Sequence, residues 1–364
     1  MENNRVKKIY DYGQSIWLDF IDRQLISSGQ LKKLIQEDGI RGITSNPAIF
    51  EKAISSSNDY DADIHKYAEE ELSDEDIFYQ LAIADIRSAA DLFLPVYEEK
   101  QQGADGYVSL EVSPLLAMDT EGTIEQAQEL WHAVDRKNVM IKIPATKAGL
   151  PAIQTSIAAG ININVTLLFS LERYEAVAEA YLSGLEERVD QGKPINGISS
   201  VASFFLSRID VLVDPILHEK NLQNLEGKVA ISSAKKAYEI YKQKFSGERW
   251  EKLAAKGARP QRLLWASTGN KNPAYSDVKY VEALIGPDTV NTIPMETLEA
   301  FRDHGDPAVR LEQDLEGASS VISQLHHEGI DLGKLMQQLE DEGIEKFNTP
   351  YRKLLAAIAS EKNN

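Results

Sequence analysis

The stretch NVMIKIPAT, residues 138–146, has the pattern of a short buried strand with a lysine in it. Side chains alternate between the two faces of a strand, so Val139, Ile141 and Ile143 share one apolar face. Met140 and Lys142 share the other face. An unpaired ammonium taken out of water costs several kcal/mol or more, so a lysine at this place needs a partner or a function.

Similar strands recur along the chain, and helix-like sequence follows each of them. The pattern predicts strands at residues 16–20, 42–46, 107–112, 139–144, 161–166, 195–203, 262–268 and 289–294. Two helix starts carry the capping-box pattern, Ser73 with Asp76 and Thr123 with Gln126. Alternating strands and helices predict parallel strands, and eight such units predict a closed (β/α)8 TIM barrel.

We expect residues 1–364 to form a single barrel domain. Helical insertions are expected at about residues 51–102 and 214–260, and residues after about 300 should form a helical extension packed on the barrel. An open, doubly wound sheet is the alternative architecture. The chain has no G-x-G-x-x-G after the first strand and no G-x-x-x-x-G-K-[ST] motif, which weakens that alternative.

Composition excludes several classes of partner. The net charge is −18 and the pI is near 4.9, and such a surface repels phosphate backbones and anionic lipids. We therefore expect no nucleic acid and no membrane among the partners. The chain has no cysteine, no apolar run near the roughly 20 residues of a membrane span, and a polar start, so we expect a cytoplasmic protein. Homo-oligomerisation is left open.

The second face of several strands is polar toward its carboxyl end. It carries Asp19 in the first strand, Glu111 in the third, Lys142 in the fourth, and Asn164 and Thr166 in the fifth. The inner faces of barrel strands point into the barrel, and barrel active sites lie at the carboxyl ends of the strands. These side chains should therefore meet at one mouth of the barrel. Met140 and Trp17, on the same faces, are expected to pack inside it.

Two interpretations of Lys142 compete. It can be half of a structural ion pair with Glu111 or Asp19. Alternatively, burial favours the neutral amine, a nucleophile that forms a Schiff base with a carbonyl and so lets a neighbouring C–C bond break. A nearby carboxylate can move the protons that this requires. The coincidence of one lysine with two carboxylates favours the Schiff base.

A metal site and a cofactor are not expected. The six histidines are scattered, and His326, His327 and Glu328 lie in the helical tail, where a surface position is expected. The patterns H-E-x-x-H and G-x-S-x-G are both absent, which excludes the common zinc proteases and hydrolase elbows.

Seven segments together resemble the transaldolases, in their longer bacterial form. In chain order they are WLDF, GITSNPAIF, VSLEVSP, VMIKIPAT, NINVTLLFS, ISSVASFFLSRID and LLWASTGNKNP. The resemblance runs from about residue 10 to at least residue 300. It implies a class I aldolase-type barrel that reversibly transfers a dihydroxyacetone unit. The donor would be sedoheptulose 7-phosphate or fructose 6-phosphate, and the acceptor an aldose phosphate.

The resemblance also implies roles for eleven residues. Lys142 would form the Schiff base, Glu111 would relay protons through a water that Thr166 helps to hold, and Asp19 would take the hydroxyl proton of the departing aldehyde. Thr44 would support Asp19. The remaining residues would bind substrate: Asn46, Asn164 and Ser203 at the dihydroxyacetone hydroxyls, and Arg208, Ser267 and Lys271 at the phosphate. Many family members have an arginine two residues after the serine that corresponds to Ser267. In this chain the nearest following cation is Lys271, four residues after Ser267.

The residues alone are also compatible with three functions other than transaldolase. A fructose 6-phosphate aldolase would release free dihydroxyacetone by the same chemistry. A barrel phosphosugar isomerase would use Lys142 only as an electrostatic helper. A barrel that binds a metabolite without catalysis is the fourth reading. In every enzymatic reading the partners are phosphorylated sugars.

Overall fold

Eight parallel strands close into a barrel at the centre of the molecule, with β8 pairing back to β1. The structure is a computed structural model and describes residues 4–99 and 103–362. The strands are β1 (Gln14–Asp19), β2 (Gly42–Thr44), β3 (Tyr107–Glu111), β4 (Val139–Pro144), β5 (Ile163–Leu168), β6 (Ser200–Phe205), β7 (Arg262–Ala266) and β8 (Thr289–Ile293). The predicted eight-stranded barrel is therefore confirmed.

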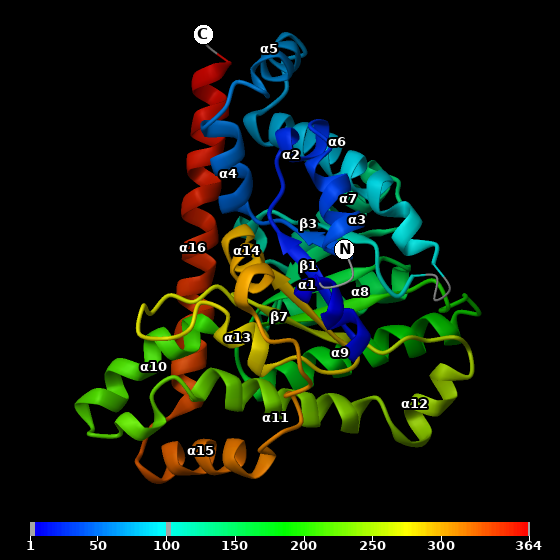
Figure 1. The fold of residues 1–364 in the computed structure, drawn as a ribbon. Coiled ribbons are helices and arrows are strands. Elements are labelled where there is room, and N and C mark those ends of the chain that lie inside the picture. The colour runs from blue at the N-terminus through cyan, green and yellow to red at the C-terminus, as the bar shows by residue number, and fades with distance from the viewer. Residues whose placement is uncertain (1–3, 100–102, 363–364) are drawn as a thin grey trace.

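Helices surround the barrel (Figure 1). They are α1 (Arg5–Ile9), α2 (Arg23–Ser27), α3 (Gln30–Glu37), α4 (Pro47–Ser55), α5 (Asp61–Glu69), α6 (Asp74–Tyr97), α7 (Thr120–Val134), α8 (Gly149–Ala159), α9 (Leu171–Asp190), α10 (Ser207–Glu219), α11 (Val229–Lys244), α12 (Gly247–Ala254), α13 (Lys279–Ala283), α14 (Met295–His304), α15 (Leu315–His327) and α16 (Leu332–Glu361). Short 3-10 turns lie at η1 (Tyr10–Tyr12), η2 (Pro114–Leu116) and η3 (Gln223–Leu225). No helix of the described residues is both long and apolar enough to cross a membrane.

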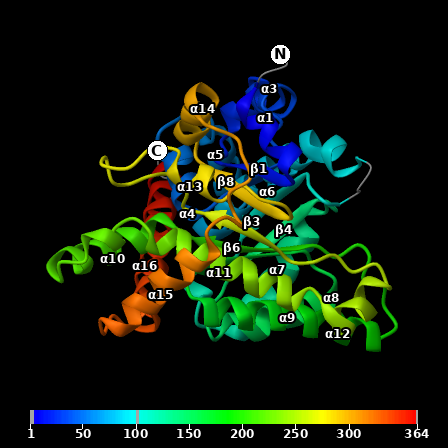
Figure 2. The same cartoon turned by 60° about the horizontal axis from the view of Figure 1, so that its bottom comes forward.

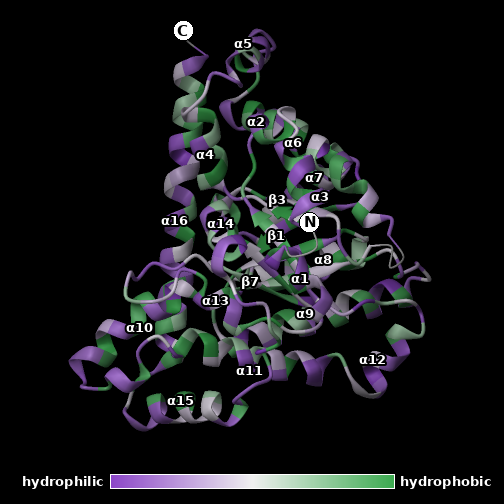
Figure 3. Ribbon diagram, in the orientation of Figure 1, coloured by the Kyte–Doolittle hydropathy of each residue, from purple (hydrophilic) through white to green (hydrophobic). Residues whose placement is uncertain are grey.

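Burial follows the alternation read from the sequence. The strand faces that pack against the helices are apolar, and Val108, Ile141, Ile143 and Val165 have no exposed surface. Figure 3 shows the surrounding helices banded in green and purple, as expected of helices with one face on the barrel and one toward solvent.

Several local predictions were wrong. The second and seventh strands end two residues early, at Thr44 and Ala266, where the chain leaves the sheet, and β5 covers Ile163–Leu168 instead of 161–166. Two larger differences involve a turn and a cap. The sixth strand begins at Ser200, not at residue 195, because Ile195 to Ile198 form a turn closed by the Ile198 N–H donating to the Ile195 carbonyl at 3.1 Å. Thr123 does not cap a helix: α7 begins earlier, with the Asp119 side chain accepting from the Gly122 N–H at 3.1 Å. The cap at Ser73, which accepts from the Asp76 N–H, is confirmed.

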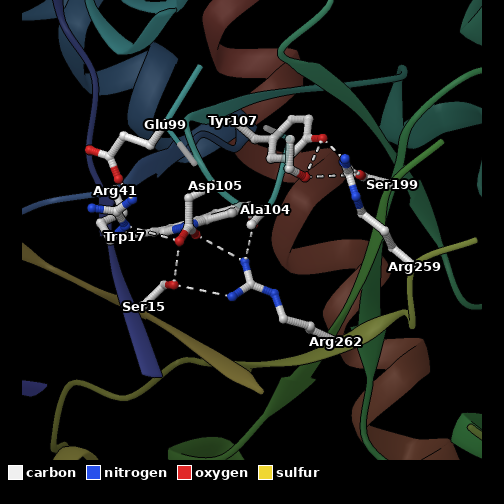
Figure 4. Close-up of polar contacts among 11 residues, drawn as sticks. Ser15, Trp17, Arg41, Glu99, Ala104, Asp105, Tyr107, Ser199, Arg259 and Arg262 are labelled. Carbon is white, nitrogen blue, oxygen red and sulfur yellow. Dashed lines mark hydrogen bonds and ion pairs between the residues drawn. The ribbon is translucent and has the colours of Figure 1, made fainter. Parts of the chain in front are cut away.

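The amino-terminal end of the barrel is closed by charges that satisfy one another (Figure 4). The Asp105 carboxylate, 2% exposed, accepts from Ser15 Oγ at 2.7 Å, Trp17 Nε1 at 3.2 Å, Arg41 Nε at 3.0 Å and Arg262 Nη2 at 2.9 Å. Four of these residues, Ser15, Arg41, Asp105 and Arg262, lie before or near the start of their strands, and Trp17 lies in the middle of β1. Chemistry at the other end is thus separated from this network by the packed barrel interior.

The last helix, α16, crosses from the bottom of the molecule to its top beside α4 (Figure 1), and Figure 2 shows it beside α10 from a second direction. Buried residues recur along it, including Met336, Leu339, Gly343, Phe347, Tyr351, Leu354 and Ile358. Since these positions share one helical face, α16 packs on the barrel and its insertions along nearly its whole length.

Candidate active site

The carboxyl ends of the strands surround a cavity of about 200 Å³. Predicted residues that line it are Asp19, Thr44, Asn46, Lys142, Thr166, Ser203, Arg208, Ser267 and Lys271. The other two, Glu111 and Asn164, lie directly beside lining residues. A larger cavity of about 760 Å³ lies at the amino-terminal end, next to the Asp105 network. We place the active site in the smaller one because the reactive side chains converge there.

Lys142 lines this cavity from β4. Its side chain is 6% exposed, and its Nζ donates to the Ser45 carbonyl at 2.8 Å and lies 3.1 Å from Glu111 Oε2. Glu111 and Lys142 are direct neighbours in the pairing of β3 with β4, which fixes this contact. Burial raises the pKa of the Glu111 carboxyl, and the charge of Lys142 only partly offsets that rise.

Asp19 lies on another side of the cavity, at the end of β1. Its Oδ1 accepts from Thr44 Oγ1 at 2.7 Å, and Thr44 Oγ1 is 2.6 Å from Thr292 Oγ1. Burial raises the pKa of Asp19, and this outweighs the opposing effects of Lys142, Thr44 and Arg208. A carboxylate with a raised pKa is a stronger base, so both acids next to Lys142 are suited to accept protons.

Amide and hydroxyl groups complete the floor of the site. Ser203 Oγ donates to Asn164 Oδ1 at 2.7 Å, and Asn164 Nδ2 donates to Ser109 Oγ at 3.0 Å. Asn164 is fully buried and lies beneath Ser203 instead of lining the cavity. Thr166 Oγ1 is buried and has no hydrogen-bond partner among the described residues.

Asn46 contributes at the same level from the start of α4. Its Oδ1 accepts from the Ile49 N–H at 3.1 Å as the helix cap, so its amide nitrogen is the atom that can donate into the cavity.

Cationic groups gather between the ends of β6 and β7. Arg208 is the second residue of α10, and its buried Nη1 has no hydrogen-bond partner among residues 4–99 and 103–362. Ser267 takes a left-handed backbone conformation (φ +53°) directly after β7, and its Oγ is 2.9 Å from Ser207 Oγ. Non-glycine residues in this conformation cost about 1–3 kcal/mol and cluster at functional sites. Lys271 reaches the same cavity from the following loop.

Comparison with known proteins agrees with this geometry. Residues 16–358 match the family model described as Transaldolase/Fructose-6-phosphate aldolase. The chain is 49% identical to a transaldolase of Trichodesmium erythraeum over 98% of this chain and 97% of the relative. It is 47% identical to a transaldolase of Thiobacillus denitrificans over 98% of this chain and 99% of the relative.

The chain belongs to the transaldolase/fructose-6-phosphate aldolase family. It is an enzyme with the function of a transaldolase. The resemblance read from the seven sequence segments is thereby confirmed, and the isomerase and the non-catalytic barrel are set aside. Within the described residues, no three histidine, aspartate or glutamate side chains are grouped so as to hold a metal ion.

This transaldolase site includes residues that the sequence did not reveal. Glu296, Phe205, Phe347 and Thr292 also line the cavity. Thr292 and Glu296 lie at and just beyond the end of β8, so the rule that barrel sites form at strand ends could have found them. Phe347 has no such signal, because it lies in α16, far along the chain from any strand.

Proposed function

We propose that Lys142 is the Schiff-base residue of this transaldolase. The observation that supports this most directly is its position: a buried amine at the carboxyl end of the barrel, 3.1 Å from Glu111 and facing the cavity that Asp19 also lines. The raised pKa of Glu111 lets it accept the proton that the ammonium must lose before it attacks. The amine then adds to the C2 carbonyl of the ketose, and water leaves as the imine forms.

Cleavage follows from the position of Asp19. Its carboxylate removes the proton of the C4 hydroxyl, the C3–C4 bond breaks, and its electron pair moves toward the imine nitrogen. An aldose phosphate leaves, and a dihydroxyacetone enamine stays on Lys142. Addition of the enamine to a second aldehyde, with the proton returned by Asp19, completes the transfer. The reaction then ends with hydrolysis of the new imine.

Glu111 and Thr166 form the proton relay in this proposal. Thr166 Oγ1 and both Glu111 carboxylate oxygens are buried without a hydrogen-bond partner among the described residues, apart from the ion-pair contact of Glu111 with Lys142. A water between the two residues would satisfy these atoms. Asn46, Asn164 and Ser203 are assigned to the dihydroxyacetone hydroxyls, and Thr44 orients Asp19.

The substrates we propose are phosphorylated sugars: sedoheptulose 7-phosphate or fructose 6-phosphate as donor, and glyceraldehyde 3-phosphate or erythrose 4-phosphate as acceptor. Arg208, Ser267 and the start of α10 would bind the phosphate, because a helix amino terminus and a guanidinium both favour an anion. Lys271 would supply the second cation, in place of the arginine that many relatives have. We also propose that the enzyme acts in the cytoplasm.

Borohydride trapping tests the assignment of Lys142. Incubation with fructose 6-phosphate and borohydride should fix a three-carbon adduct on Lys142, which peptide mass spectrometry would locate. Lys235 provides a matched control, because it is also buried but donates its Nζ hydrogen bond to the Gln313 carbonyl away from the cavity. Lys235→Ala should keep the label and Lys142→Ala should lose it. A label on another lysine would contradict the proposal.

A further inference from the structure

One face of α16 crosses the mouth of the barrel. Residues four apart lie on the same side of a helix, and Gly343, Phe347 and Tyr351 form a buried stripe of this kind. Phe347 is 5% exposed and lines the cavity, with its ring centroid 5.9 Å from Lys142 Nζ. Tyr351 Oη continues the stripe by donating to Glu75 Oε1 at 2.5 Å.

Gly343 lets the helix lie close to the site. A Cβ atom at this position would be 3.0 Å from Leu167 Cδ2 and 3.8 Å from Arg208 Nη1, so there is little room for a side chain. The stripe thus passes from the phosphate side of the cavity to the side of Lys142.

The helix is tied to the barrel on both sides of Phe347. Glu340 forms an ion pair with Arg173 at 3.2 Å, in which both side chains are almost fully buried. Arg173 Nη1 also donates to the carbonyl of Ala145, directly after the strand of Lys142. Near the far end, Lys362 Nζ lies 3.1 Å from Asp74 Oδ1. Phe347 is therefore held over the amine by the fold.

The position matters because the enamine on Lys142 has two fates. It can add to an acceptor aldehyde, which is transfer. It can also take a proton at the nucleophilic carbon to give an iminium, to which water adds, releasing dihydroxyacetone and the free amine. The second route converts the ketose phosphate into an aldose phosphate and dihydroxyacetone, and it needs water at the reacting atoms.

We propose that Phe347 is a specificity-determining residue that keeps water from the enamine and so favours transfer over release of dihydroxyacetone. This rests on the proposed Schiff base at Lys142. Lys142 Nζ lies over the apolar ring of Phe347, 5.9 Å from its centroid, and its other contacts are with oxygen atoms of Glu111 and Ser45. Excluding water from a reactive intermediate prevents its hydrolysis. The α16 helix thereby becomes part of the catalytic site as well as part of the packing.

Three variants separate this role from a structural one. Phe347→Ala removes the ring, whereas Phe347→Leu retains an apolar side chain over the amine. Leu354→Ala is the matched control, because Leu354 is fully buried on the same face of α16 but does not line the cavity. For each variant, free dihydroxyacetone formed from fructose 6-phosphate alone is measured against transfer to erythrose 4-phosphate, together with the melting temperature.

We expect the ratio of release to transfer to rise by about tenfold or more in Phe347→Ala, since the enamine is then open to water. The ratio should stay near that of the parent enzyme in Phe347→Leu and Leu354→Ala. In deuterium oxide, the released dihydroxyacetone should carry carbon-bound deuterium. An unchanged ratio in Phe347→Ala, or an equal rise in Leu354→Ala, would overturn the inference.

Borohydride trapping on the same samples keeps the two proposals apart. If Lys142 is labelled but the ratio does not change, only the role of Phe347 fails. If Lys142 is not labelled in the parent enzyme, the Schiff-base proposal itself fails.

Discussion

At the scale of single residues, two buried carboxyl groups share one lysine. Burial is the largest cause of the raised pKa in both Asp19 and Glu111. A carboxyl whose folded pKa is raised contributes stability below its unfolded pKa, and this is lost as the pH rises through the folded pKa. The site therefore loses this stability as the pH rises through the folded pKa values, and it gains two carboxylates that are stronger bases than exposed ones.

The first prediction concerns Glu111. Glu111→Gln should lower turnover by about 10²- to 10⁴-fold, the range for an acid/base group. The melting temperature should change little, because glutamine fills nearly the same space and Lys142 Nζ keeps its hydrogen bond to the Ser45 carbonyl. Turnover and a thermal melt measured on the same preparation check this. If Glu111 were only an ion-pair partner of Lys142, its removal would instead cost about 3–5 kcal/mol of stability, and the melting temperature would fall.

The raised pKa values also predict a pH profile. The acidic limb of kcat/KM should lie above pH 4.5, the usual pKa of a glutamate, because both Glu111 and Asp19 must lose a proton at higher pH than an exposed carboxyl. A titration of kcat/KM from pH 4 to 8 measures this limb. A midpoint below 4.5 would show that Glu111 does not act as a base with a raised pKa.

Phosphate binding gives a prediction for Arg208 and Lys271. Arg208→Ala should raise KM for phosphorylated ketoses strongly, because a guanidinium grips phosphate with two parallel hydrogen bonds. Lys271→Ala should raise it less, since lysine acts as a point charge. Unphosphorylated fructose is the internal control, and its KM should hardly change. If Lys271→Ala leaves KM for phosphorylated ketoses unchanged, the second phosphate-binding cation is another residue.

At the scale of secondary-structure elements, the strands and their inward-facing residues could be predicted from the sequence, whereas the packing position of helix α16 could not. Alternation placed Asp19, Lys142 and Thr166 on one face, and parallel pairing then forced them to the same mouth. The buried face of α16 predicts only that the helix packs on something. Which surface it covers depends on the whole barrel and its insertions, so Phe347 could not be assigned from sequence.

The loop after β7 yields an element-scale prediction. Asn270 Nδ2 donates to the carbonyls of Asn272 at 2.7 Å and Tyr275 at 2.8 Å, and Asn270 Oδ1 accepts from the Asn272 N–H. These bonds hold the loop that carries Lys271. Asn270→Ala should therefore raise KM for fructose 6-phosphate with little change in kcat. In a Lys271→Ala background, Asn270→Ala should hardly change KM further. Additive effects of the two substitutions on KM in this double-mutant cycle would contradict the inference that Asn270 acts by holding Lys271.

At the scale of the whole molecule, the barrel separates stability from chemistry. The charges at the amino-terminal end pair with one another around Asp105 (Figure 4), whereas those at the other end include groups without partners among the described residues, such as Arg208 Nη1. Satisfied charges add to rigidity, and unsatisfied ones are available to a substrate. Strand alternation predicted the chemical end because Asp19, Glu111, Lys142 and Thr166 lie within strands. Asp105 lies in a connecting segment with no periodicity, so nothing predicted its role.

This separation predicts that Asp105→Asn loses stability and keeps activity. The change removes ion pairs with Arg41 and Arg262, whose side chains are 12% and 17% exposed, and should cost about 3–5 kcal/mol. Asp91→Asn is the control, because Asp91 is 54% exposed in its pair with Arg136 and should cost about 1 kcal/mol or less. Urea unfolding measures both, and turnover at 25 °C should remain near that of the parent enzyme.

The pH dependence of the stability lost in Asp105→Asn tests the ion pairs of Asp105 most directly. The arginines hold the pKa of Asp105 below its usual value of 3.8. A lowered folded pKa means that the stabilisation is fully present above pH 3.8 and is lost as the pH falls through the folded pKa. The stability difference between the parent enzyme and Asp105→Asn should therefore be constant from pH 5 to 7 and should narrow only below pH 3.8. A difference that already narrows near neutral pH would mean that the carboxylate is not held by these arginines.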